Sequence, residues 1–406
     1  MLEESEARSR ILEATIPGKI EQVDLDQAAS RFSASDILAT TALPGFDNSQ
    51  MDGYAVRAGD AQQGVELTIV GEQAAGPRQP LLVNQGEAVR IFTGAPMPEG
   101  ADAVVMQEDV DRIDQTRIRI NEAAEPGEFV RREGSDLCIG QKILARGDRI
   151  NPARLGVLAS QGLTSLNVHP QPRCAIVTTG DELATPGSEL TEGAIYNSNG
   201  PMLASLVRQF GAGEVRNFHA PDEPETLRSV LDQAIQTSDI CLIAGGVSVG
   251  EHDHVKDQLA ALDVAGGFWR VRIKPGKPLF FGQKADKLVF GLPGNPVSAY
   301  ITFLLFALPA FRKWQGQTVT ADSPTLPRIP AKLAGDAIND RGNRPHYLRG
   351  WLDLESLTFR PLGLQQSHAL FALSRTNALV RVEPEQSRRA GETAPCFLVA
   401  DSLGET

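Results

Sequence analysis

The chain has 406 residues, of which 41% are hydrophobic and 22% are charged. A chain of this length predicts two to four domains of roughly 100–200 residues each, and this composition excludes wholesale disorder. Acidic residues outnumber basic ones by 51 to 39, which gives a net charge of −12. That balance argues against a general nucleic-acid binder, but it leaves room for a local basic pocket that holds an anion.

The cysteines are widely spaced, which is typical of neither a disulfide framework nor a zinc site. The start of the chain is charged and lacks the apolar stretch of a signal peptide. The most apolar segment, 300–311, is shorter than the ~20 residues that cross a bilayer. We therefore expect a soluble, cytoplasmic protein whose partners include neither a membrane nor a nucleic acid.

In chain order, residues 1–45 carry a helical periodicity and end in the turn signal Leu-Pro-Gly. Short apolar runs broken by glycine and proline fill the region from about 46 to 150, which predicts β-strands and turns. Residues 151–168 predict a short helix followed by a strand.

From residue 173 onward, apolar strand-like runs alternate with helical segments. Asp222 is the expected N-cap of one of these helices, because Glu225 follows three residues later. The alternation predicts βαβ units and a largely parallel sheet, and such sheets bind ligands at the carboxyl ends of their strands. After residue 320, short strands with turns predict a small all-β domain.

The richest cluster of chemistry-bearing residues falls where three predicted strands end, at 179–182, 245–253 and 291–296. Small residues let backbone N–H groups approach a ligand, and helix N-termini behind them favour an anion. A single such loop can be an ordinary turn. Three of them at one sheet edge, two with carboxylates, indicate a binding site.

Two standard motifs overlap the second of these loops. Gly245 and Gly250 have the spacing of a phosphate-binding P-loop, but Glu251 stands where that motif requires lysine. Residues 246–250 match the G-x-S-x-G nucleophile elbow of α/β-hydrolases, which needs an acid and then a histidine later in the chain. The residues alone leave open whether Ser248 is a nucleophile or a donor to a phosphate or ribose.

A basic run follows, made of Arg270, Arg272, Lys274 and Lys277. The first three alternate along the chain and would share one face of a strand, so a solvated strand face is the simplest interpretation. Prolines next to both lysines stiffen their loop, which suits positioned charges that bind an oxyanion.

Two loops of the first β-region, 46–55 and 131–136, combine acids with glycine. Asp, Asn and Ser side chains cap turns well, and acid-rich loops also bind hard cations such as Mg²⁺. The spacing fits both roles.

Taken together, these segments resemble the MoeA family of molybdopterin molybdenumtransferases, which includes the E domain of gephyrin and its plant counterpart. The final domain carries a weaker resemblance than the rest. The matching segments occur in family order and are FDNSQMDGYA at 46–55, RIFTGAPMPEGADAVVMQED at 90–109, RREGSD at 131–136, VTTGDEL at 177–183, YNSNGPML at 196–203, GGVSVGEHDHVKD at 245–257, IKPGKP at 273–278, GLPGNPVS at 291–298, NRPHYLRG at 343–350 and QQSH at 365–368.

The resemblance implies a multidomain α/β plus β fold and a homodimer. Its parts are an elongated dimerisation segment from 1–45 and 141–170, an inserted β-rich domain at 46–140, a parallel-sheet α/β domain of MogA-like fold at 171–320 that binds the pterin, and a C-terminal β-barrel-like domain at 321–406.

The implied reaction belongs to molybdenum cofactor biosynthesis. Adenylylated molybdopterin is cleaved with Mg²⁺, AMP is released, and molybdate is inserted to give the cofactor. Cleaving a phosphoanhydride demands mainly metal ions, positioning and charge neutralisation, and the residues agree with this chemistry. The molybdopterin adenylyltransferase and downstream molybdoenzyme chaperones are implied as further partners.

The resemblance also implies site residues. Catalytic roles fall on Asp52, Thr93, Asp136, Glu182, Asp222 and Asp253, of which Asp52, Thr93 and Asp136 are expected to act in the partner subunit's cleft. The Mg²⁺ ligands would be Asp181, Glu182 and Asp253. The substrate would be bound by Gly245, Gly246, Ser248, Gly250, Lys274, Lys277, Pro293, Asn295, Pro296, Arg344 and Ser367.

Two other functional classes stay open at this point. A hydrolase that uses Ser248 would be inactivated by a serine-directed phosphonate. A non-catalytic scaffold, a role that gephyrin's E domain also has by binding receptor peptides, would leave the pterin site dispensable. The sequence shows no second, MogA-like domain of the kind found in the fused eukaryotic versions, so we expect a stand-alone biosynthetic enzyme.

Overall fold

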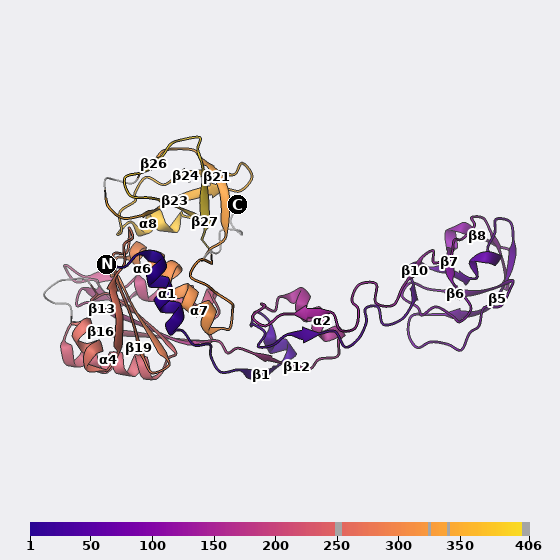
Figure 1. The fold of residues 1–406 in the computed structure, drawn as a ribbon, viewed down its shortest axis with the longest axis horizontal. Helices are drawn as coiled ribbons and strands as arrows, with labels where there is room; N and C mark the ends of the chain where they lie inside the picture. The colour runs from indigo at the N-terminus through magenta and orange to yellow at the C-terminus, as the bar shows by residue number, and fades with distance from the viewer. Residues whose placement is uncertain (248–253, 324–325, 339–341, 400–406) are drawn as a thin grey trace. The chain divides into compact units, whose positions relative to one another are not determined.

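The computed structural model describes residues 1–247, 254–323, 326–338 and 342–399. The chain forms two compact units (Figure 1). Unit 1 comprises Met1–Ser35, Arg146–Pro152 and Thr164–Thr406, and unit 2 comprises Asp36–Ala145 and Ala153–Leu163. Within the described ranges, no helix is long and apolar enough to cross a membrane.

A six-stranded sheet forms the centre of the α/β part of unit 1, in the order β16-β13-β17-β20-β19-β18. This confirms the predicted α/β fold, but the sheet is mixed rather than wholly parallel, because β19 is antiparallel to both of its neighbours. The connections on either side of β19 are too short for the crossover that parallel strands need. The strands are β13 (Arg173–Thr179), β16 (Glu214–Ala220), β17 (Ile240–Ala244), β18 (Ala265–Arg270), β19 (Pro278–Lys284) and β20 (Lys287–Leu292).

Helices cover both faces of this sheet, so its central strands are apolar on both sides. Val177 and Cys241 belong to the core shared with α4 and α5. Their neighbours Ile176 and Leu242 point to the opposite face and belong to the core shared with α1, α3, α6 and α7 (Figure 1). The helices are α1 (Glu4–Ala14), α3 (Asn199–Gln209), α4 (Pro224–Gln236), α5 (Val255–Ala261), α6 (Pro296–Thr302) and α7 (Leu308–Trp314), with a π-helical turn at Phe303–Ala307.

The prediction of helical structure over residues 1–45 is wrong beyond α1. The helix ends at Ala14, and Pro17 follows, whose ring disfavours a helical conformation of the residue before it. A 3₁₀ turn lies at Leu25–Ala28. Before it, β1 (Glu21–Asp24) pairs with β12 (Ser165–Val168), a partner distant in sequence. Long-range pairing therefore overrides the local helical periodicity.

Unit 2 is built on a second six-stranded sheet, in the order β7-β4-β6-β5-β9-β8. The strands predicted from short apolar runs are thus confirmed. Helix α2 (Pro152–Ser160), followed by β12 of unit 1, also confirms the helix and strand predicted at 151–168. The other elements of this unit are β2 (Ile37–Leu38), β3 (Asn48–Ser49), β4 (Gly53–Val56), β5 (Glu66–Gln73), β6 (Glu87–Ile91), β7 (Ala103–Met106), β8 (Val110–Arg112), β9 (Arg117–Ile120), β10 (Val130–Arg131), β11 (Lys142–Leu144) and 3₁₀ turns at Ala58–Asp60 and Gln107–Asp109.

The C-terminal part of unit 1 is a closed barrel with the strand order β21-β24-β23-β25-β27. The predicted β-barrel-like domain is confirmed, whereas the exact domain boundaries stay predictions. The elements are β21 (Arg328–Leu333), β23 (His346–Asp353), β24 (Thr358–Pro361), α8 (Leu370–Ser374), β25 (Ala378–Val382) and β27 (Thr393–Leu398). Short ladders join β14 (Leu183–Ala184) to β15 (Ile195–Tyr196) and β22 (Ala337–Ile338) to β26 (Ser387–Arg388).

Candidate functional site

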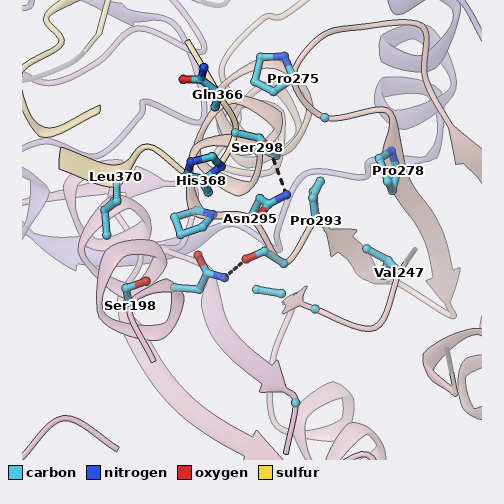
Figure 2. Close-up of a pocket in the computed structure, with 18 of the residues that line it drawn as sticks. Ser198, Val247, Pro275, Pro278, Pro293, Asn295, Ser298, Gln366, His368 and Leu370 are labelled. Carbon is cyan, nitrogen blue, oxygen red and sulfur yellow. Dashed lines mark hydrogen bonds between the residues drawn. The ribbon is translucent and has the colours of Figure 1, made fainter. Parts of the chain in front are cut away.

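The strand order of the unit 1 sheet reverses at β13. From β13 the chain passes through α3 to β16 on one side, and then through α4 to β17 on the other side. Ligands of open α/β sheets bind at such a point, outside the carboxyl ends of the strands. A cavity of about 1170 Å³ lies there, and Figure 2 shows Val247, Pro293 and Asn295 around it.

The cavity is lined by segments at the ends of four strands of the sheet, β13, β16, β17 and β20, and by the start of α3. A loop before β19 and segments next to barrel strands complete it. Most of the lining residues come from within the segments 179–183, 195–199, 244–247, 274–278, 293–296, 344–348 and 365–370, although not every residue of these segments lines the cavity, and Asp222 joins them.

Two glycines bring the backbone after β17 close against its surroundings. Gly245 has φ +107° and Gly246 has φ +61°, conformations that side chains rarely adopt. A Cβ on Gly245 would lie 2.6 Å from the carbonyl oxygen of Thr179, and one on Gly246 would lie 2.4 Å from Val255 Cγ2. Only glycine therefore lets this loop pack so closely against the end of β13 and the start of α5, at the edge of the cavity that both glycines line.

The predicted N-cap role of Asp222 is wrong. The N-cap of α4 is Glu223, whose carboxylate accepts hydrogen bonds from the N–H groups of Glu225 and Thr226. The physical reason is Pro224, which occupies the first helical position and so places the cap on the residue directly before it.

Asp222 instead belongs to a group of polar side chains at the end of β13. Its Oδ1 accepts a hydrogen bond from Thr179 Oγ1 at 2.7 Å, and its backbone N–H donates to Asp181 Oδ1 at 3.0 Å. Asp222 and Glu182 line the cavity, whereas Asp181 lies beside it and does not. The structure therefore brings together three of the predicted acids.

The simplest interpretation of the basic run, one solvated strand face, is also wrong. β18 ends at Arg270, and Arg272 turns away to form an ion pair with Glu3 at 3.0 Å. Lys274 and Lys277 line the cavity, and the two arginines do not. The chain leaves the sheet after Arg270 and is held by the barrel instead, where the backbone N–H of Lys274 donates to the Pro345 carbonyl.

The barrel contributes the predicted residues Arg344 and Ser367 to the same cavity. Arg344 Nη1 donates to the Ile273 carbonyl at 3.0 Å, next to Lys274. Ser367 Oγ accepts a hydrogen bond from Asn295 Nδ2 at 3.1 Å (Figure 2). The predicted residues Pro293, Asn295 and Pro296 thus meet the barrel across this space.

Two of the three predicted residues of unit 2 lie together. Asp52 Oδ1 accepts hydrogen bonds from the backbone N–H of Thr93 at 2.8 Å and from its hydroxyl at 2.9 Å. These bonds, the backbone one foremost, lower the pKa of the Asp52 carboxyl below its ordinary value. Asp136 is exposed, and its backbone N–H donates to the Leu43 carbonyl at 2.9 Å.

Three predicted residues, Ser248, Gly250 and Asp253, lie outside the described residues. The predictions made for them are a substrate contact for Ser248 and Gly250, and catalysis and Mg²⁺ binding for Asp253. The hydrolase alternative also rests on Ser248.

Sequence reasoning missed several polar residues that line the cavity, among them Asn197 and Asn199. Gln366 and His368 also line it, and Figure 2 shows both. Asn199 Nδ2 donates to the Gly294 carbonyl at 2.7 Å and so ties α3 to the loop after β20. The signal was present in the asparagines of 196–203 and in the QQSH run, because amide side chains next to predicted strand ends and turns are frequent ligand contacts.

The reversal of strand order, the glycine loop beside it and the cations on the same cavity define an α/β protein that binds an anionic ligand. Comparison with known proteins narrows this class. Three family models match successive parts of the chain: the MoeA N-terminal region (domain I and II) at 2–162, a probable molybdopterin binding domain at 175–313 and the MoeA C-terminal region (domain IV) at 331–398.

Curated relatives match over nearly the whole chain. The chain is 36% identical over 401 residues to the molybdopterin molybdenumtransferase of Haemophilus influenzae, and the match covers 97% of each chain. It is 38% identical over 371 residues to molybdopterin molybdenumtransferase 2 of Mycobacterium tuberculosis, and this match covers 89% of this chain and 90% of that one. The solved molybdopterin biosynthesis moeA protein from Pyrococcus horikoshii matches with a TM-score of 0.83 and 29% identity, over 98% of this chain and 100% of that one. The chain belongs to the MoeA family.

Proposed function

We propose that this chain is a molybdopterin molybdenumtransferase of molybdenum cofactor biosynthesis. It takes adenylylated molybdopterin and molybdate, cleaves the phosphoanhydride and releases AMP. The relatives that carry this name match at nearly full length, which supports this enzyme class over the hydrolase and scaffold alternatives.

The observation that carries the proposal is the composition of the cavity in unit 1. Gly245 and Gly246 line the cavity after β17, and Lys274, Lys277 and Arg344 line the same space. Backbone N–H groups bind phosphate oxygens, and fixed cations neutralise oxyanions. A substrate with a phosphoanhydride and a second, tetrahedral oxyanion needs both kinds of group in one place.

The family implies Mg²⁺, and the donors present fit this ion. Within the described residues, no group of three or more His, Cys, Asp or Glu side chains could hold a metal. Mg²⁺ usually takes only one or two protein carboxylates and completes its octahedron with water and substrate phosphates. Glu182 on the cavity and Asp181 beside it offer such oxygens and would hold the ion. When bound, it would neutralise charge on the phosphoanhydride.

The remaining residues bind and orient the substrate. Asp222 is fixed by Thr179, so its carboxylate has one orientation at the cavity. Asn295 and Ser367 join the loop after β20 to the barrel and so hold that wall in place. We assign the cleavage of the anhydride to the β13 end and the binding of molybdate to the Lys274–Lys277 loop.

We further propose that the enzyme is a homodimer in which Asp52 acts on the partner subunit's substrate. Its exposed carboxylate, held by two hydrogen bonds from Thr93, supports a functional role, since nothing in unit 2 buries it. Mixing inactive Asp52→Ala and inactive Asp222→Ala proteins should restore part of the activity through heterodimers with one intact site. No recovery after proven subunit exchange would contradict action in trans.

The direct test incubates the purified protein with adenylylated molybdopterin, molybdate and Mg²⁺. AMP is quantified by chromatography, and the cofactor is quantified by activation of an apo-molybdoenzyme. We expect AMP and cofactor to form together and to depend on both molybdate and Mg²⁺. Absence of AMP release under these conditions would overturn the proposed function. A serine-directed phosphonate should leave the reaction unchanged.

A further inference from the structure

Glu4 is a buried carboxylate in the first turn of α1, and only 8% of its surface is exposed. Its Oε1 accepts a hydrogen bond from the Tyr347 hydroxyl at 2.7 Å. Its Oε2 accepts one from Arg381 Nε at 3.3 Å, and Arg8 Nη1 lies 3.6 Å from Oε1. Tyr347 belongs to β23 and Arg381 belongs to β25, so one side chain of α1 is bound by two strands of the barrel.

The bond between Glu4 and Tyr347 is a strong one. A buried charge is unfavourable unless it is paired and hydrogen-bonded, and both oxygens of Glu4 have partners here. Burial, together with the charge of Glu4, raises the pKa of the Tyr347 hydroxyl well above its ordinary value, so this group remains a donor at neutral pH. A hydrogen bond to an ionised acceptor is roughly twice as strong as one between neutral groups.

Tyr347 is also the residue that fixes the backbone of Lys274. Its N–H donates to the Lys274 carbonyl at 2.8 Å, and the Lys274 N–H donates to the Pro345 carbonyl at 2.8 Å. Both backbone groups of Lys274 are thus bound by the segment 345–347. Lys274 lines the cavity, whereas Glu4 and Tyr347 do not. Glu4 therefore reaches the cavity wall through Tyr347 and Lys274.

The residues just before Glu4 bind the stretch of backbone that leads into the Lys274–Lys277 loop. The N–H of Leu2 donates to the Arg270 carbonyl at 3.0 Å, and the Leu2 carbonyl accepts from the N–H of Arg272 at 2.8 Å. Two segments therefore bond to this part of the backbone, one next to Glu4 and the other on β23. The side chain of Glu4 joins these two segments to each other.

These contacts lead to one part of the cavity. They converge on the Lys274–Lys277 loop, to which we assign molybdate, and not on the end of β13, to which we assign the cleavage of the anhydride. A lysine whose loop is already fixed binds an anion more tightly than a loosely held one, because binding then costs less conformational entropy. A loss of Glu4 should therefore affect the two substrates unequally.

We propose that Glu4 is a positioning residue for the oxyanion: through Tyr347 it fixes the backbone at Lys274, so that the two lysines of this loop meet the anion in one arrangement. This inference rests on the proposed function, because it takes molybdate as the oxyanion.

The experiment compares Glu4→Ala, which removes both oxygens, with Glu4→Gln, whose amide oxygen can still accept from Tyr347. Glu6→Ala is the matched control, because Glu6 is an exposed acid of the same helix whose ion pair is with Arg10 of that helix. Binding of molybdate and of adenylylated molybdopterin is measured separately by calorimetry, below the thermal midpoint of each variant. Molybdate is also titrated in the cofactor-forming reaction, and amide hydrogen exchange is followed over residues 271–277 without ligand.

We expect Glu4→Ala to raise the half-saturating molybdate concentration about three- to tenfold, because the anion must then order the lysines itself. Its affinity for adenylylated molybdopterin should stay close to that of wild type, and its amides over 271–277 should exchange faster. Glu4→Gln should lie between Glu4→Ala and wild type, and Glu6→Ala should behave as wild type.

Three results would overturn the inference. Equal losses of both affinities in Glu4→Ala would reduce Glu4 to a structural tie between α1 and the barrel. An unchanged molybdate titration, or unchanged exchange over 271–277, would show that Glu4 does not hold the lysines. An equal rise of the molybdate requirement in Glu6→Ala would show that the buried position of Glu4 is irrelevant.

If Glu4→Ala does not fold, Tyr347→Phe decides, because it removes only the hydroxyl and leaves the backbone bonds to Lys274. A raised molybdate requirement with unchanged affinity for adenylylated molybdopterin supports the inference, and an unchanged requirement contradicts it. Wild type that binds molybdate in the calorimeter but forms no cofactor would contradict the proposed function alone, and the calorimetric comparison would still decide the role of Glu4.

Discussion

Replacing Lys277 with glutamine tests the assignment of the oxyanion most directly. Lys277 is exposed and lines the cavity, with its loop held by the barrel through Lys274. Two unit charges about 4 Å apart interact by about 1 kcal/mol in water and about 4 kcal/mol at an effective dielectric constant of 20. Because Lys277 is exposed, the lower part of this range applies, and we expect a loss of about 1–2 kcal/mol.

That loss corresponds to a roughly 5–30-fold higher half-saturating molybdate concentration. The assay is a molybdate titration of cofactor formation at fixed adenylylated molybdopterin. Salt provides a second check, because the Debye length shrinks from about 30 Å at 0.01 M to about 8 Å at 0.15 M. The wild-type titration should weaken more over this range than the Lys277→Gln titration.

The matched control is Arg270→Gln, which removes the same charge from the same basic run but outside the cavity lining. We expect its molybdate titration to superimpose on that of wild type. If Lys277→Gln also superimposes, or if Arg270→Gln weakens molybdate use as much, then the local placement of Lys277 is irrelevant and our assignment of the oxyanion is refuted.

Three further predictions concern other parts of the structure. Gly246→Ala should lower the free energy of unfolding by at least about 1–2 kcal/mol in urea titrations, because its φ of +61° is unfavourable for alanine. The control Gly156→Ala, in the interior of α2 with open space around it, should not destabilise the protein. Equal free energies of unfolding in the two variants would contradict backbone strain at position 246. Asp222→Asn should keep the wild-type thermal midpoint but lose most AMP release, and normal release would exclude the carboxylate from the reaction. Burial raises the pKa of the Cys241 thiol to about 12, so above about pH 9 the unfolded chain loses this proton while the folded chain keeps it, and stability should fall as pH rises toward 12. In urea titrations at pH 8–11, Cys241→Ala should flatten this decline, and replacement of the exposed Cys138 by alanine should not. If stability falls equally with pH in wild type and both variants, the decline does not come from the Cys241 thiol.

Much of the fold was predictable from the sequence because its signals are local. Strands buried on both faces appear as continuous apolar runs, such as those of β13 and β17, and the helices between them carry a period of 3.6. The glycines at 245–246 directly follow one of these strands, so their place at the carboxyl edge of the sheet follows from the alternation alone. Lys274 and Lys277 also stand out locally, because a proline follows each of them and stiffens their loop.

The tertiary structure alone decided which of these residues meet. The four cations of 270–277 look equivalent along the chain, and only pairing with the start of β23 turns the two lysines toward the cavity while Arg272 binds Glu3. Only the fold shows that the carboxylate of Asp222 binds Thr179, which is distant in sequence. Glu4 carries no local signal of burial, because a helix pattern does not reveal that the barrel binds it. These outcomes depend on contacts between segments far apart in the chain, whose free energies come from packing and desolvation, and neither periodicity nor spacing encodes them.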